Sequence, residues 1–345
     1  MEKIAEEILF PAAMEIDRAA SVPRSYLDEL AAAGLYDLPG DPASAAHVIE
    51  TLAGASLVTT FVWIQHHSPV RAVAAAGGAL ADRWLSPLRA GAVRAGIAYA
   101  ALRRPGPPSA TAVRRPDGSW VLDGFAPWVT GWGLVDVVLA GARCGDPVGP
   151  DGVGPGAGAS DAGASDAGGS GAGGDVVWLL LDARADRPAG FTATPVELAT
   201  MQASSTYELR WSGFEVPAER VVGIEPFADW RRRDSAGRAS NGYLAVGVAA
   251  RCAQLLGSPA LAAEVDAARQ ALLDSTPATV VAARARASLL AVRAATALVT
   301  AGGGRSVEAS AHAARLMREA TFLLVFGQSP DIKAAQLAAL DVGPA

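Results

Sequence analysis

The sequence predicts an α+β fold in which an N-terminal helical domain, a middle β-domain of short antiparallel strands and a C-terminal helical bundle follow one another. Apolar residues recur with helical periodicity in the first and last thirds of the chain, whereas the middle alternates apolar and polar residues between tight turns. With 345 residues and 51% hydrophobic content, the chain can bury a sizeable core. A wholly disordered protein is therefore excluded.

Helices are predicted for residues 1–95, because apolar side chains repeat at helical spacing from Ile4 to about Arg94. Glycines and prolines interrupt the pattern and separate successive helices. Glu2 and Glu6 fall among the first apolar residues, whereas a secretory signal needs a basic end and an uninterrupted apolar run. We therefore expect no export signal and a cytoplasmic location.

Strands are predicted for residues 96–224. The pair Asp117-Gly118 predicts a tight turn that leads into the strand pattern Ser119-Trp-Val-Leu. Alternation is clearest from Tyr207 to Ser212, where apolar side chains would face one side of the sheet and polar ones the other. Residues 145–175 consist mostly of Gly, Ala, Ser, Asp and Pro, which predicts a disordered insertion between two strands.

Helical periodicity returns in residues 225–345, in three or four Ala-rich segments whose small side chains allow helix axes to approach closely. The most apolar of these segments, residues 278–301, carries Arg284, Arg286 and Arg293. Placing each arginine in hydrocarbon would cost roughly 2.5–3.5 kcal/mol. The segment is therefore predicted to be a helix of a soluble bundle and not a membrane span.

Composition excludes several classes of partner. The net charge of −6 disfavours nucleic acid, because binding to phosphates needs a basic surface. Cys144 and Cys252 cannot form a disulfide framework or a multi-cysteine metal site. His66 and His67 would point about 100° apart on a helix with no third ligand in view, so we expect structural or substrate-lining roles for them. No nucleic acid, membrane or metal ion is predicted as a partner.

Three segments, in this order, resemble the acyl-CoA dehydrogenase family. The first, Ala98-Tyr-Ala-Ala-Leu-Arg-Arg-Pro-Gly with residues 117–131, is similar to the family's flavin-binding β-domain. The second, residues 204–223, contains a Val-Pro turn and a following glycine like the family's closing strand pair. The third, Gly302-Gly-Gly followed by Arg315-Leu-Met-Arg-Glu-Ala, resembles the family's glycine pair and Arg-Asp-Ala helix. The resemblance spans most of the chain and implies a helical domain, a β-domain and a helical bundle around FAD.

The resemblance also implies cofactor-binding residues by position. Trp128 falls where the family packs an indole beside the flavin ring, and Thr130 falls where a hydroxyl and a backbone group bond the flavin N5 edge. Ser109 matches a serine near the cofactor pyrophosphate. Arg103 and Arg104 replace a hydroxyl residue and a glutamate of the family, so they would either bind phosphates of FAD or CoA or lie in a solvated loop. A purely structural alternative is that Trp128 fills the sheet face with the other strand tryptophans.

The family removes an α-proton with a carboxylate, and this sequence has none at the two usual places. Counting back from the Arg-Leu-Met-Arg-Glu-Ala match, the usual glutamate position falls on Ser310. The place used by some branches falls on Gly237, just before Arg238, which we expect to bind substrate. Glu308 is the candidate catalytic base, and the alternative is that it is an exposed acid at a helix start.

The implied function is an FAD-dependent oxidoreductase of lipid metabolism that acts on the CH–CH group of an acyl-CoA or another acyl thioester. The family's cofactor site implies a homo-oligomer or a hetero-oligomer with a homologous subunit, and an electron-acceptor flavoprotein is a further candidate partner. One alternative is a flavin-dependent monooxygenase on the same fold, which needs no α-proton base. Another is a non-catalytic subunit, because the chain after Leu256 lacks the family's segment that reaches a neighbouring cofactor.

Overall fold

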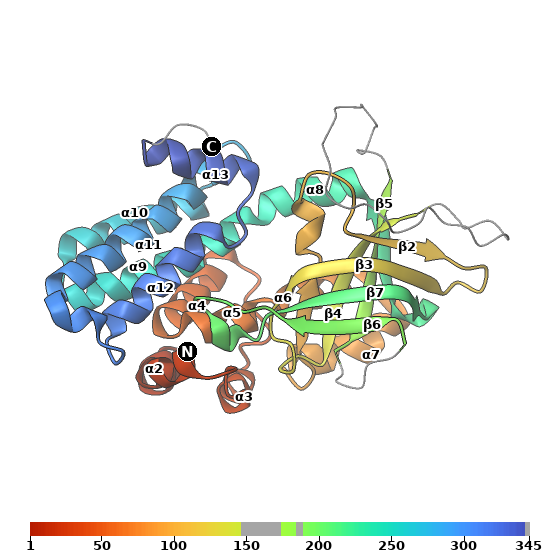
Figure 1. Ribbon diagram of the computed structural model, residues 1–345, viewed down its shortest axis with the longest axis horizontal. Helices are drawn as coiled ribbons and strands as arrows, with labels where there is room; N and C mark the ends of the chain where they lie inside the picture. The colour runs from red at the N-terminus through yellow and green to blue at the C-terminus, as the bar shows by residue number, and fades with distance from the viewer. Residues whose placement is uncertain (146–173, 184–188, 342–345) are drawn as a thin grey trace.

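The computed structural model describes residues 1–145, 174–183 and 189–341, and its helical, β and helical regions follow the predicted order (Figure 1). The predicted α+β class is confirmed. Most of the insertion expected at residues 145–175 lies outside the described residues, and β5 (Asp175–Asp182) follows it. In Figure 1 the helices and the sheet stand side by side, and α8 (Phe227–Ala236) reaches from one to the other.

The helices before the sheet begin at residue 2 and end at residue 89. They are α1 (Glu2–Ile4), the π-helical turn η1 (Ala5–Leu9), α2 (Phe10–Arg18), α3 (Arg24–Ala32), α4 (Pro42–Ala55), α5 (Leu57–Ile64), α6 (His67–Ala76) and α7 (Gly78–Arg89). At the start of α4 the Asp41 carboxylate accepts a hydrogen bond from the Ser44 backbone N–H at 2.8 Å. Such an N-cap satisfies one of the free amides of the first turn, so the sequence itself fixes where this helix starts.

The described strands form a single eight-stranded sheet. They are β1 (Ala95–Ala98), β2 (Ala110–Arg114), β3 (Trp120–Val129), β4 (Val137–Cys144), β5, β6 (Phe191–Pro195), β7 (Tyr207–Val216) and β8 (Val221–Pro226), with short 3₁₀ turns η2 (Ala100–Arg103), η3 (Gln202–Ser204) and η4 (Ala218–Arg220). The order is β6-β7-β3-β2-β4-β5-β8, with β1 beside β4. Pairing is antiparallel except that β4 runs parallel to β1 and β2, a mixture that the sequence did not predict.

Strand β3 is irregular, and the irregularity positions the residues that follow it. Its register against β7 shifts between Leu122 and Gly124 and again between Ala126 and Val129. Gly124 has a φ of +112°, and a Cβ there would lie 2.1 Å from the carbonyl oxygen of Ser109, so only glycine fits. Bulges of this kind bend a strand and re-aim its side chains, and here the second one contains Trp128 and ends just before Thr130.

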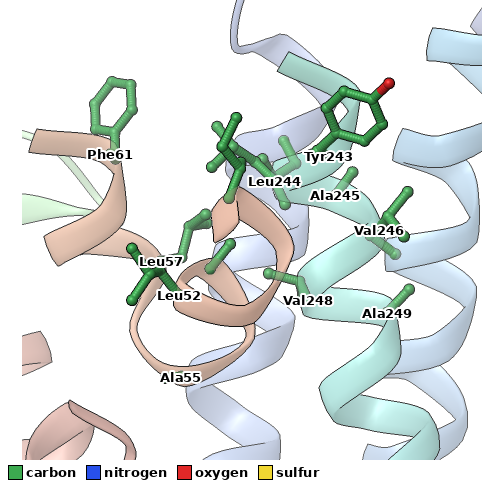
Figure 2. Packing of buried hydrophobic residues seen from close by; sticks show 14 of the residues in the cluster. Leu52, Ala55, Leu57, Phe61, Tyr243, Leu244, Ala245, Val246, Val248 and Ala249 are labelled. Atoms are coloured by element: carbon green, nitrogen blue, oxygen red, sulfur yellow. The ribbon is translucent and has the colours of Figure 1, made fainter. Parts of the chain in front are cut away.

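The C-terminal bundle packs on the N-terminal helices to make one core. It consists of η5 (Gly237–Ala239), α9 (Ser240–Leu256), α10 (Pro259–Leu273), α11 (Val280–Gly302), η6 (Gly303–Val307), α12 (His312–Val325) and α13 (Pro330–Ala339). Figure 2 shows Leu52 and Leu57 beside Leu244 and Val248 of α9, and all four belong to one buried apolar cluster. The two helical regions that the sequence separates by the sheet are therefore continuous in space.

Two glycines let α4 and α9 approach closely. A Cβ on Gly247 would lie 2.3 Å from the backbone oxygen of Glu50, and a Cβ on Gly54 would lie 2.9 Å from the backbone oxygen of Gly247. We expect Gly247→Ala to lower the free energy of unfolding by about 1–3 kcal/mol, because the helix backbones must separate. In an isolated helix the same change would stabilise by about 1 kcal/mol.

Chemical denaturation of the Gly247→Ala variant measures this effect. Gly237→Ala is the matched control, because Gly237 has a φ of −78° and a Cβ there meets nothing within 4 Å. A Gly247→Ala protein more stable than wild type would contradict the close approach of the two helices.

The segment Val280–Val307, which includes α11, is long and apolar enough to cross a membrane, and it is the one such segment among the described residues. In this fold α11 packs against α9 and α12, and the Arg284 side chain is 1% exposed. Its Nη2 donates to the carbonyl oxygen of Phe326 at 3.1 Å, just past the end of α12. A cation at a helix C-terminus is favourable, which accounts for an arginine buried in this bundle.

Candidate functional site

A cavity of about 2090 Å³ lies where the helices, the sheet and α8 meet. It is lined by residues of α5 and α6, the segment after β1, the end of β3, strands β5 and β8, helix α8, and the turn after α12. Pockets for drug-sized ligands usually measure about 300–1,000 Å³. This cavity therefore has room for a large cofactor together with a second ligand.

Trp128 stands on the cavity wall with 46% of its surface exposed. Trp120 on the same strand is 4% exposed and belongs to the core of the sheet, and Trp132 packs against Phe191 and Tyr207. Of the two roles considered for Trp128, the structure rules out filling the sheet face. A large aromatic ring left open in a concave site provides a stacking surface for a planar ligand.

Thr130 follows β3 and is tied to the turn before β7. Its hydroxyl lies 3.3 Å from the Thr206 hydroxyl, which in turn lies 2.8 Å from the Ser204 hydroxyl. Ser205, beside Ser204, has a φ of +50°, a left-handed conformation that costs a non-glycine residue about 1–2 kcal/mol. Both threonines line the cavity, so this strained turn fixes two hydroxyls at its wall.

Three carboxylates line the cavity within the described residues, and each pairs with an arginine. Asp234 accepts two hydrogen bonds from Arg103, at 2.9 and 2.6 Å. Asp331 lies 3.6 Å from Arg238.

The third carboxylate, Glu225, accepts two hydrogen bonds from Arg233 at 2.6 Å and one from Trp178 Nε1 at 2.6 Å. The hydrogen bonds from Arg233 lower the pKa of Glu225 below its usual value. Every described cavity carboxylate therefore lies within 4 Å of an arginine nitrogen, although the Asp331 carboxylate is 69% exposed.

The other predicted binding residues divide between the cavity wall and its surroundings. Arg103 and Arg238 line the cavity, each already held by an acidic partner. Ser109 does not line it, and its backbone oxygen accepts the Phe125 N–H at 2.8 Å. Thr111 of β2 is a hydroxyl residue on the wall nearby in sequence, which the motif count did not select.

The candidate base Glu308 lies away from this cavity. It is exposed between η6 and α12, and Arg18 of α2 donates to the carbonyl of its neighbour Ala309. The cavity is lined by the opposite end of α12, at Phe322 and Val325, and 14 helical residues span about 20 Å. A general base must lie within hydrogen-bond reach of the proton it removes, so Glu308 of this chain does not serve the cavity.

Ser310, at the position counted as the usual glutamate site, also lies away from the cavity, in the same exposed turn before α12. The turn at the other end of α12, residues 326–329, is the one that lines the cavity. A Cβ on Gly327 in that turn would lie 2.6 Å from Nδ2 of Asn241, another cavity residue that sequence reasoning missed. The count along the sequence therefore selected the wrong end of the helix.

His66 is held by the backbone and has a structural role. Its Nδ1 accepts the Ala95 N–H at 3.0 Å, so the hydrogen sits on Nε2, which donates to the Leu88 oxygen at 3.0 Å. Burial and the positive charge of Arg94 lower the pKa of His66 to about 4, although the hydrogen bond to Leu88 acts in the opposite direction. His66 therefore stays neutral and connects α6 to β1.

His67 is buried but faces different surroundings. It lines the cavity at 4% exposure, and its Nε2 has no hydrogen-bond partner within the described residues. Its ring meets Trp63 edge-on, with 4.5 Å between ring centres. Burial, followed by the electrostatic influence of the adjacent His66 and of Arg71, holds the pKa of His67 well below its usual value. The imidazole is therefore neutral at neutral pH.

An aromatic cluster that the sequence did not indicate forms another part of the wall. Tyr99 meets Trp178 edge-on at 5.1 Å, Phe227 stacks with Trp230 at 5.4 Å, and the Arg143 guanidinium lies 3.9 Å from the Phe227 ring centre. These rings come from three separated parts of the chain. Trp178 of β5 lies between the other two parts, because its ring also lies 6.1 Å from the Trp230 ring of α8.

No protein-family model and no curated protein matches the sequence. Solved structures do match, and they define the fold as that of the acyl-CoA dehydrogenases. The chain is similar to the butyryl-CoA dehydrogenase of Megasphaera elsdenii, with 19% identity, a TM-score of 0.77, and coverage of 98% of this chain and 95% of that one. The resemblance in fold expected from the three sequence segments is thus confirmed.

Two further structures similar to this chain are complexes with a ligand. One is a glutaryl-coenzyme A dehydrogenase in complex with glutaryl-CoA, at 18% identity and a TM-score of 0.76, covering 99% of this chain and 93% of that one. The other is a glutaryl-CoA dehydrogenase of Mycobacterium smegmatis in complex with FADH2, at 16% identity and a TM-score of 0.72, covering 99% and 92%.

Proposed function

We propose that this protein is a flavin-dependent oxidoreductase of the acyl-CoA dehydrogenase type that acts on an acyl thioester. The observation that carries the proposal is the open face of Trp128 in a cavity of about 2090 Å³. Similarity in fold to proteins described with FADH2 and with glutaryl-CoA supports the choice of ligands. Electron transfer to an acceptor flavoprotein, oligomer formation and a cytoplasmic location belong to the same proposal.

The residues of the wall fit an FAD molecule. The Trp128 ring would stack beside the flavin, and the Thr130 hydroxyl would bond the edge of the ring system. Arg104 and Arg231 line the cavity and are exposed, so they can meet phosphate oxygens, whereas the Arg103 guanidinium is engaged by Asp234. Bound FAD supplies the hydride acceptor, and the protein supplies the position and the exclusion of water.

The visible absorption spectrum of the purified chain tests flavin binding directly. We expect Trp128→Ala to weaken FAD binding about 10-fold, equivalent to about 1.4 kcal/mol, because a stacking surface is lost. Titration of the flavin-free protein with FAD, followed by fluorescence quenching, measures this. Ile224→Ala is the control, since Ile224 lines the same cavity with 47% exposure but lies on β8. Equal affinity of wild type and Trp128→Ala would contradict the placement of the flavin.

A flavin-dependent monooxygenase is the second candidate. It is favoured by the pairing of Glu225, Asp234 and Asp331 with arginines, because that reaction needs no carboxylate to remove an α-proton. Anaerobic bleaching of bound flavin by an acyl-CoA supports dehydrogenation. Product that forms only with reduced flavin and oxygen supports the monooxygenase.

The alternative of a non-catalytic subunit predicts that the chain purified alone carries no flavin. Flavin that appears only after co-expression with a homologous subunit would support that role and count against the proposal above.

A further inference from the structure

Thr130 is the outer member of a short chain of three hydroxyls. Its Oγ1 lies 3.3 Å from Thr206 Oγ1, and Thr206 Oγ1 lies 2.8 Å from Ser204 Oγ. Thr130 and Thr206 line the cavity at 4% and 5% exposure, whereas Ser204 is 0% exposed and is not part of the cavity wall. The chain of hydroxyls therefore starts in the protein interior and ends at the cavity.

The turn that carries Ser204 and Thr206 is held from two sides. Next to β3, the Gly131 N–H donates to the carbonyl oxygen of Ser204 at 2.9 Å. On the side of the helices, the Val22 N–H donates to the carbonyl oxygen of Ala203 at 2.8 Å. These bonds fix a turn that contains strained residues, so the hydroxyls keep their positions relative to the end of β3.

The number of hydrogens determines what the chain of hydroxyls presents to the cavity. Three hydroxyls carry three hydrogens, and the two links use one hydrogen each. Ser204 Oγ has no hydrogen-bond partner other than Thr206 among the described residues, so its hydrogen points to Thr206 Oγ1. The opposite direction would leave a buried donor unpaired, which costs more than a typical hydrogen bond gains. The remaining hydrogen therefore belongs to Thr130 or Thr206, and the cavity wall presents a donor.

A donor at this wall distinguishes the two oxidation states of a flavin. The nitrogen that receives hydride has a free lone pair in the oxidised ring and accepts a hydrogen bond. Two-electron reduction places a hydrogen on that nitrogen, which then donates. A wall donor therefore bonds the oxidised ring and meets an N–H in the reduced ring. Hydrogen bonds to ring nitrogens are one means by which a protein tunes its cofactor.

We propose that Thr206 is a positioning residue that keeps the Thr130 hydroxyl a donor and thereby favours oxidised over reduced FAD. The inference rests on the proposed function, which places the edge of the flavin at Thr130. The Thr206 hydroxyl donates to Thr130 Oγ1, so the hydrogen of Thr130 is available to the ring. The Thr130 hydroxyl has no other partner among the described residues. Without Thr206 it would turn freely and accept from the reduced ring as readily as it donates to the oxidised one.

The test compares wild type with Thr206→Val, which keeps the branched shape of the side chain and removes its hydroxyl. Titration of the flavin-free protein gives the affinity for oxidised FAD, and anaerobic equilibration of the loaded protein with redox dyes gives the midpoint potential. We expect Thr206→Val to bind oxidised FAD about 5-fold more weakly, the effect of one neutral hydrogen bond, with little change for reduced FAD. At about 30 mV per tenfold change for a two-electron couple, the potential rises by about 20 mV.

Two variants separate the hydroxyl from its surroundings. Thr206→Ser keeps the hydroxyl and should restore the wild-type potential. Thr321→Val is the matched control, because Thr321 lines the same cavity but its hydroxyl donates to the Met317 backbone oxygen at 3.0 Å. If Thr206→Val does not fold, Thr130→Val replaces it, since removal of the outer hydroxyl is expected to raise the potential by the same amount.

The outcomes separate this inference from the proposed function. A protein that takes up no flavin in either oxidation state overturns the proposed function. A protein that binds FAD overturns the role of Thr206 alone if neither Thr206→Val nor Thr130→Val raises the potential, or if Thr206→Ser raises it as far as Thr206→Val.

Discussion

The variant Glu319→Ala is expected to lose about 3–5 kcal/mol of folding stability, because it leaves the Arg315 cation buried without its carboxylate partner. Arg315 is 0% exposed and Glu319 is 2% exposed, and Arg315 Nη1 donates to the carboxylate at 2.6 Å. The carboxylate also interacts favourably with the backbone amide of Leu57 at the start of α5, the helix that leads to His67. Loss of this pair therefore weakens both the bundle and one wall of the cavity.

Urea unfolding followed by circular dichroism measures the effect of Glu319→Ala. Glu308→Ala removes an exposed carboxylate before the same helix and should change the free energy of unfolding by less than about 0.5 kcal/mol. The double variant Arg315→Met with Glu319→Leu buries two apolar side chains instead and is expected to regain most of the loss. A drop below 1 kcal/mol in Glu319→Ala would mean that the pair is not desolvated in solution.

Acidification from pH 7.5 to pH 4.5 is expected to lower the free energy of unfolding by about 2–3 kcal/mol through His66 alone. Its pKa is about 4 in the folded chain against 6.5 for an unperturbed imidazole. The unfolded chain therefore takes up a proton over this range while the folded chain does not. Stability that is fully present above pH 6.5 is lost as the pH falls towards 4. The lowered pKa of His67 acts in the same direction.

The pH dependence is measured by urea unfolding at several pH values between 7.5 and 4.5. His66→Asn cannot take up the proton, so its stability should vary with pH by about 2–3 kcal/mol less than that of wild type. His47→Gln should keep the wild-type slope, because His47 is exposed. Parallel curves for His66→Asn and wild type would show that His66 is accessible to protons in the folded state.

Part of the site was predictable from short motifs. The order of the regions follows from periodicity, and the indole and hydroxyl at Trp128 and Thr130 follow from a motif at the end of one strand. A catalytic base could not be predicted in this way. The count along the sequence led to Ser310 and Glu308, although the structure places the cavity at the other end of α12. A count fixes a position along a helix, but it does not say which end of that helix faces a cavity.

The sequence by itself determined the succession of helices and strands, because helical and strand periodicity depend on residues only a few positions apart. It also determined that neither position expected for the catalytic glutamate holds a carboxylate, since these positions are Gly237 and Ser310. Only the tertiary structure decided that Arg103 pairs with Asp234, 131 residues away, and that Nε2 of His67 is buried without a hydrogen-bond partner among the described residues. Burial and ion pairing are set by segments that meet through packing, so local patterns along the chain do not contain them.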